Sequence, residues 1–230
     1  MSDYLQPLIT SMAEAADAHN AAQMAAYLRN QFPFLGIKSP QRRELLKAFL
    51  REYGPPALDD TASVAKELWG QTVREHQYNA LDILRRQQKK LGPEFVPTLE
   101  WLIITKSWWD TVDGLASNIA GPIFAGYPET RATAVRQWRS VENIWLRRTT
   151  LLFQLKYKDK TDAPLLFSLI EENLLDKEFF IQKAIGWALR EYSKTDETAV
   201  REFVANTELS PLAEREALKW LKRQEQKNSP

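Results

Sequence analysis

The sequence has no cysteine and only two histidines, His19 and His76, among its 230 residues. Without cysteine the chain has no disulfides, no zinc–thiolate sites and no thiol nucleophile. Two histidines far apart offer little material for a Ser-His-Asp triad or for a metal site built from several imidazoles. A glycine-rich loop able to cradle phosphate is also missing. We therefore expect chemistry that needs neither a metal nor a cofactor.

Long apolar runs and a strong net charge are absent as well. No apolar stretch approaches the roughly 18 residues of a transmembrane helix, and the amino terminus lacks a basic-then-apolar signal pattern. We expect a soluble, cytoplasmic protein with no membrane partner. The net charge is only +1, yet residues 131–160 hold eight Lys and Arg against Glu142 and Asp159. Such segregation lets a near-neutral protein present one positive face, although a charge run is usually only solvated surface.

Helical periodicity dominates the chain, and no segment shows the sustained alternation of a β-strand. Proline and glycine mark the breaks, for example at residues 54–56 and 126–128. The predicted helices span residues 3–16, 20–31, 40–53, 61–69, 73–90, 93–105, 108–119, 128–138, 142–157, 162–174, 177–193, 196–206 and 210–226. No linker divides them, so we expect one domain over residues 1–230 with a frayed, polar tail at residues 224–230.

The helices repeat with a period of 35 residues. Ile144–Thr150 aligns with Phe179–Ile185 at that offset, and residues 75–84 fit the same frame at an offset near 69. This period is typical of paired helices that stack into an α-solenoid, whose concave surface is lined by one helix from each repeat. We therefore predict an all-α fold of this kind.

Two adjacent tryptophans followed by a carboxylate form the most unusual stretch of the sequence. On a helix, Trp109 and Asp113 lie about 40° apart, one turn from each other. Aspartate is rarely fully buried unless it is paired. The repeat frame places Asp113, Arg148 and Lys183 at successive equivalent positions, so stacking should bring them onto adjacent ridges of one surface. The alternative is that Trp108 and Trp109 anchor the core and that Asp113 is solvated.

A second aromatic and several cations fall into the same frame. Trp187 follows Lys183 by four residues, and Arg190 follows Trp187 by three. Periodicity alone fits equally well with a core position for Trp187. It also fits with a purely solubilising role for Arg148 and Lys156. These alternatives stay open on the residue pattern.

Several longer strings resemble the AlkD-type DNA glycosylases of alkylated purines. The strings are Phe34–Ile37, Thr105–Asp113, Asn143–Arg148, Leu152–Lys158 and Lys177–Tyr192. The similarity covers nearly the whole chain, from about Met24 to Lys222. The family is built of HEAT-like helical repeats, so the resemblance implies an α-solenoid of such repeats with a concave basic groove.

The resemblance also implies roles for individual residues. Asp113 matches the catalytic carboxylate, and Trp109 and Trp187 match the aromatic pair that contacts the backbone and sugar of the lesion nucleotide. The implied DNA-binding set is Tyr27, Lys38, Arg43, Arg148, Lys156, Lys183 and Arg190. In this set Arg148 matches a contact to the DNA backbone. Lys38 departs from the family pattern, which has glutamine there, and a cation would either strengthen phosphate contact or disturb a cationic base.

The implied activity is hydrolysis of the N-glycosidic bond of N3- and N7-alkylated purines in duplex DNA, without strand cleavage. Such bases are already cationic and leave readily, so the enzyme must stabilise an oxocarbenium-like sugar. We expect a monomer whose partner is double-stranded DNA, with no obligate protein partner. The alternatives are a HEAT-like module that binds distorted or branched DNA without catalysis, and a protein-interaction solenoid. Asp113 with both tryptophans argues against the first, and the basic cluster against the second.

Overall fold

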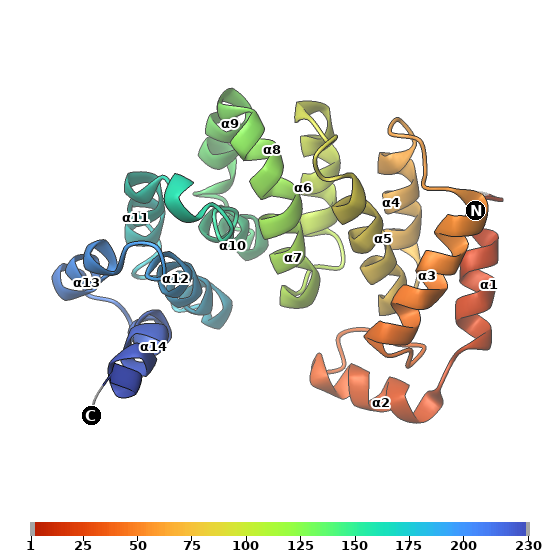
Figure 1. Ribbon diagram of the computed structural model, residues 1–230, viewed down its shortest axis with the longest axis horizontal. Helices are drawn as coiled ribbons and strands as arrows, with labels where there is room; N and C mark the ends of the chain where they lie inside the picture. The colour runs from red at the N-terminus through yellow and green to blue at the C-terminus, as the bar shows by residue number, and fades with distance from the viewer. Residues whose placement is uncertain (1–2, 229–230) are drawn as a thin grey trace. The chain divides into compact units, whose positions relative to one another are not determined.

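The computed structural model describes residues 3–228, and throughout that range the regular backbone is helical, with no β-strand (Figure 1). The predicted all-α fold of helical repeats is therefore confirmed. Within the same range, no helix combines the length and the apolar character needed to cross a membrane.

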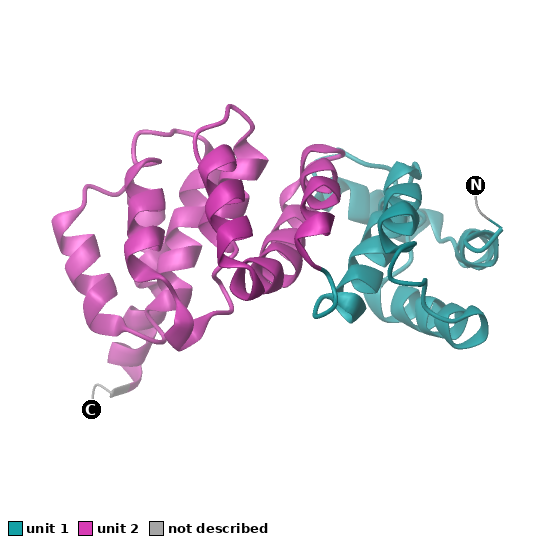
Figure 2. Ribbon diagram, turned by 90° about the horizontal axis from the view of Figure 1, so that it is seen from above, with its two compact units in different colours: residues 1–91 teal, residues 92–230 magenta. Residues whose placement is uncertain are grey.

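The chain forms two compact units, residues 1–91 and residues 92–230 (Figure 2). The expectation of a single domain over the whole chain stays a prediction, and each unit is described by itself. The first unit holds α1 (Gln6–Glu14), α2 (Ala18–Tyr27), α3 (Ser39–Tyr53), α4 (Thr61–Gly70) and α5 (Arg74–Gln87). In this unit α5 packs against α3 and α4, and α1 packs against α3.

A buried carboxylate organises the segment between α2 and α3. Glu75, fully buried at the start of α5, accepts hydrogen bonds from the backbone N–H groups of residues 35, 36 and 37 at 2.8–3.2 Å. Gly36 has φ +88°, and a Cβ there would lie 2.0 Å from the carbonyl oxygen of Asp17. Only glycine fits this position. The same bonds hold the chain that leads into Lys38, the residue at the amino-terminal cap of α3.

The second unit continues the paired-helix pattern. Its elements are η1 (Pro93–Phe95), α6 (Val96–Ile104), α7 (Trp109–Leu115), the π-helical turn η2 (Ala116–Ala120), α8 (Gly121–Gly126), α9 (Pro128–Trp138), α10 (Ile144–Leu152), η3 (Lys158–Lys160), α11 (Ala163–Glu171), α12 (Phe179–Tyr192), α13 (Glu197–Asn206) and α14 (Pro211–Asn228). Helices α7, α10, α12 and α14 contact one another in succession. Helices α9 and α11 pack against α10, and α13 packs against α12. Helices α7, α10, α12 and α14 therefore form one layer, which carries the site described below.

Several predicted boundaries differ from the structure. The helix predicted over residues 108–119 continues as far as Gly126, because the π-helical turn shifts the hydrogen-bond register just before Pro122, which has no N–H to donate. The helix predicted over residues 142–157 ends at Leu152, where the chain enters successive turns. The helix predicted over residues 210–226 extends to Asn228, and the expectation of a frayed tail from residue 224 stays a prediction. Residues 229–230 of that tail lie outside the described range.

Candidate functional site

The backbone turns sharply just before α7. Lys106 adopts a left-handed conformation with φ +50°, which is uncommon for a residue with a side chain. Trp108 is then extended and caps the helix, and the N–H groups of Thr111 and Val112 bond to its carbonyl oxygen. Helix α7 consequently begins at Trp109, four residues before Asp113, as the spacing predicts.

Asp113 and Arg148 form a buried, two-point ion pair between α7 and α10. Arg148 Nε donates to Asp113 Oδ1 at 2.7 Å, and Arg148 Nη2 donates to Oδ2 at 2.9 Å. The third nitrogen, Nη1, donates to the backbone carbonyl of Phe180 in the first turn of α12. The side chains of Asp113 and Arg148 are only 15% and 5% exposed. One guanidinium thus ties three helices together and fixes the orientation of the carboxylate.

The electrostatics of Asp113 combine opposing effects. Burial is the largest effect and raises the pKa of the Asp113 carboxyl above its ordinary value. The hydrogen bonds and positive charge of Arg148 lower that pKa, whereas the neighbouring charge of Asp110 raises it. The balance is a raised pKa. Because both carboxylate oxygens accept a hydrogen bond from Arg148, the pair as arranged contains the ionised form.

The adjacent tryptophans occupy different environments. Trp108 packs with Trp145 and Phe180, with ring centroids 5.7 Å and 5.0 Å away. Trp109 is half-buried on the helix that carries Asp113, and Trp187 is half-buried on α12. Trp108 thus belongs to an aromatic cluster, although it is half-buried like Trp109 and Trp187, and part of each of the three rings remains accessible.

The other predicted cations of this unit are held by different kinds of partner. Lys156 is exposed, and its ammonium donates to the side-chain oxygen of Asn118 in the π-helical turn. Lys183 and Arg190 instead share the carboxylate of Glu216, at 2.9 Å and 2.8 Å. A neutral amide leaves the charge of Lys156 intact, whereas Glu216 offsets part of the charge of the other two.

The predicted site residues of the first unit gather around one cavity. Tyr27, Lys38 and Arg43 are exposed and line a cavity of about 370 Å³, together with the rings of Phe34 and Tyr78. Its lining thus combines aromatic faces with positive charge. The remaining predicted residues all belong to the second unit.

The chain was compared with known proteins. Residues 8–221 match the family described as DNA alkylation repair enzyme. The chain belongs to this DNA alkylation repair family. A solved structure, described as a predicted DNA alkylation repair enzyme from Enterococcus faecalis, is similar at 36% identity with a TM-score of 0.83. The alignment covers 90% of this chain and 96% of that one. A search among curated proteins found no match.

Two polar residues that bond to the predicted cations, Glu216 and Asn118, were not predicted from the sequence. Glu216 stands 33 residues after Lys183, close to the repeat length, so the repeat frame contained a signal for it. Asn118 had no comparable signal. Its position depends on the π-helical turn, which periodicity did not predict.

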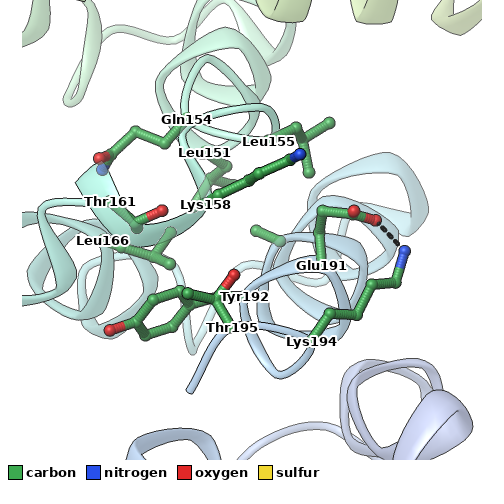
Figure 3. Close-up of a pocket in the computed structure, with 11 residues that line it drawn as sticks. Leu151, Gln154, Leu155, Lys158, Thr161, Leu166, Glu191, Tyr192, Lys194 and Thr195 are labelled. Atoms are coloured by element: carbon green, nitrogen blue, oxygen red, sulfur yellow. Dashed lines mark hydrogen bonds and ion pairs between the residues drawn. The ribbon is translucent and has the colours of Figure 1, made fainter. Parts of the chain in front are cut away.

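A separate cavity, about 310 Å³, lies among the ends of α10 and α12 and the start of α11 (Figure 3). Leu151, Leu166 and other apolar side chains contribute to its wall, and Lys194 at its edge pairs with Glu191 at 2.6 Å. None of the predicted site residues lines this cavity. Asp113 and its two tryptophans therefore lie outside it.

Proposed function

We propose that this family member is a monofunctional DNA glycosylase that hydrolyses the N-glycosidic bond of N3- and N7-alkylated purines in duplex DNA and leaves an abasic site. The observation that carries the proposal is the Asp113 carboxylate, held at two points by Arg148 and placed one helical turn from Trp109. Part of the same proposal is a monomer that acts in the cytoplasm, at the chromosome.

The chemistry follows from the charge that develops during the reaction. As the cationic base departs, positive charge moves onto the sugar, and the fixed anion of Asp113 stabilises it. The same carboxylate orients a water molecule for attack at C1′. The faces of Trp109 and Trp187 attract positive charge and shield the sugar from bulk water. Most glycosylases insert the target base deeply into a pocket. An open layer of helices instead suits recognition of the backbone and sugar without such insertion.

Arg148 acts in this proposal as a positioning residue. The resemblance matched it to a contact with the DNA backbone. Its three bonding nitrogens, however, are engaged by Asp113 and by the carbonyl of Phe180, and its side chain is buried. We therefore assign it the task of holding the catalytic carboxylate ionised and oriented.

Phosphate contacts fall to the remaining cations and to Tyr27. The remaining cations are Lys38 and Arg43 in the first unit, and Lys156, Lys183 and Arg190 in the second. Such contacts set the register of the protein on the duplex and carry no sequence information.

The direct test is release of 7-methylguanine from methylated duplex DNA, followed by chromatography of the free base. The proposal expects free base and an intact, abasic strand. Tight binding of distorted or branched DNA with no free base at high enzyme concentration would favour the non-catalytic module instead.

Duplex binding should depend steeply on salt. Each phosphate contact should cost about 0.9 log units of affinity per tenfold rise in salt concentration. Lys156→Gln should lower that slope by about one contact, because the neutral Asn118 partner leaves the full charge of Lys156 available. Fluorescence anisotropy with an undamaged duplex measures both quantities. Affinity that stays constant between low and moderate salt would contradict the phosphate contacts.

Base release should be independent of divalent metal ions. The proposed chemistry uses a carboxylate, a water molecule and two aromatic faces, and the sequence offers no cysteine and only two histidines. The rate of 7-methylguanine release should therefore be the same with and without EDTA. Loss of activity in EDTA that a divalent ion restores would show that the mechanism is incomplete.

A further inference from the structure

Glu216 joins two cations that stand on either side of Trp187. On α12, Lys183, Trp187 and Arg190 have the spacing i, i+4 and i+7 and share one helix face. Oε1 of Glu216 lies 2.9 Å from Lys183 Nζ, and Oε2 lies 2.8 Å from Arg190 Nη1. A single carboxylate from α14 therefore bridges both ends of this stripe, beside a proposed catalytic tryptophan.

Close packing of α14 on α12 fixes where that carboxylate lies. A Cβ added to Gly186 would come within 2.5 Å of Glu216 Cβ and 2.7 Å of the Ala213 carbonyl oxygen. Ala213 and Ala217 are fully buried on the same side of α14. Small residues thus let the two backbones approach, and the Glu216 side chain, 12% exposed, is held against α12.

The cluster carries less positive charge than its cations suggest. The hydrogen bond from Lys183 is the main cause that lowers the pKa of Glu216, and it outweighs burial, so the carboxylate is ionised at neutral pH. The positive charge of Lys219 on α14 also lowers the pKa of Glu216, so one anion offsets one of three nearby positive charges. Lys183 and Arg190 are 36% and 25% exposed, more than Glu216, so both cations reach solvent while the anion they share lies deeper.

We propose that Glu216 is an internal counter-anion that limits how strongly Lys183 and Arg190 bind DNA phosphate. A carboxylate bound by Lys and Arg resembles a bound phosphate in charge and in hydrogen-bonding geometry. Duplex DNA therefore meets a cluster that is already partly neutralised, which weakens binding to undamaged DNA and eases its release. This rests on the proposed function only in that Lys183 and Arg190 face the duplex.

The test is binding of an undamaged duplex by Glu216→Gln at several salt concentrations. Glutamine has nearly the same shape and removes the negative charge. We expect affinity to rise on the order of tenfold at 0.1 M salt and the salt slope to steepen by about one contact, the effect of one more released counterion. Glu216→Asp keeps the charge and should retain the wild-type slope. Unchanged or weaker binding by Glu216→Gln, or equal tightening by both variants, would overturn the proposal.

Glu172→Gln is the matched control. Glu172, exposed just after the end of α11, pairs with Arg139 just after the end of α9, so the change in formal charge is the same but lies outside the layer of α7, α10, α12 and α14. The affinity of Glu172→Gln for the duplex should lie within about twofold of wild type, since a remote exposed charge is screened by salt. Equal tightening by this control would show a general charge effect and refute a specific role for Glu216.

A double variant separates the effect of charge from any change in packing that Glu216→Gln causes. Lys183→Gln combined with Glu216→Gln removes one positive and one negative charge, so the net charge of the cluster is that of wild type, and affinity and slope should return to wild-type values. A slope below wild type would mean that Glu216 never offset Lys183. These binding results do not depend on catalysis. If the protein releases no base but Glu216→Gln still binds the duplex more tightly, the glycosylase proposal fails and the counter-anion proposal stands. If base is released but Glu216→Gln does not bind more tightly, the counter-anion proposal fails and the glycosylase proposal stands.

Discussion

Asp113→Asn should slow single-turnover release of 7-methylguanine by roughly 10²–10³-fold, the size typical of losing one preorganised electrostatic partner. In the proposed complex the carboxylate faces a polyanion, which is unfavourable for binding. Its stabilising interaction strengthens only as the glycosidic bond breaks and the sugar becomes cationic. Affinity for the methylated duplex should therefore be unchanged or slightly tighter. Rapid quenching at saturating enzyme measures the rate, and anisotropy measures the affinity.

Asp176→Asn provides a control of similar chemistry. Asp176 pairs with Arg147, the residue next to Arg148, at 2.6 Å, and both side chains are less than one-fifth exposed. The control thus also weakens a partly buried Asp–Arg pair of the same unit, and its release rate should stay within a fewfold of wild type. If Asp113→Asn kept a near-normal rate, the catalytic assignment would be wrong and the non-catalytic DNA-binding module would gain support.

Arg148→Ala should impair both stability and chemistry. Removing one partner of a buried ion pair leaves an uncompensated charge, which costs about 3–5 kcal/mol of unfolding free energy. Base release should slow on the order of 10²-fold, because the carboxylate loses its orientation and part of its ionisation. Chemical denaturation measures the first effect and single-turnover kinetics the second. Arg147→Ala, which removes the neighbouring arginine, should have a much smaller effect on the rate.

The pH profile separates positioning from a merely structural role. The proposed mechanism requires ionised Asp113, so the rate of release should fall as pH drops through the raised pKa of that carboxyl. Arg148 lowers that pKa, so its removal raises the pKa further and moves the acid limb to higher pH. Arg148→Lys keeps a positive charge without the two-point geometry and should lie between wild type and alanine. An unchanged pH profile with weaker DNA binding and a lower salt slope would instead restore Arg148 as a phosphate contact.

Much of the helical framework was predictable because it depends on local pattern. Helix positions follow from apolar spacing and from Pro and Gly breaks, and the 35-residue repeat is visible in Ile144–Thr150 and Phe179–Ile185. The place of Asp113 one turn after Trp109 needs only the pitch of a helix. One exception is the helix through Pro122, where a π-helical turn lets the helix continue past a proline, a residue that ordinarily ends a helix. That adjustment depends on packing against neighbouring helices.

The partners of the charged side chains were decided by the tertiary structure. The repeat frame by itself determined that Asp113, Arg148 and Lys183 occupy equivalent positions. It did not determine that Arg148 bonds to Asp113 or that Lys183 bonds to Glu216. Those pairings depend on how closely successive helices approach, and small residues such as Gly186 set that distance. A long side chain can reach several acceptors, and interhelical spacing selects among them, so the charge presented to a ligand emerges only in the folded protein.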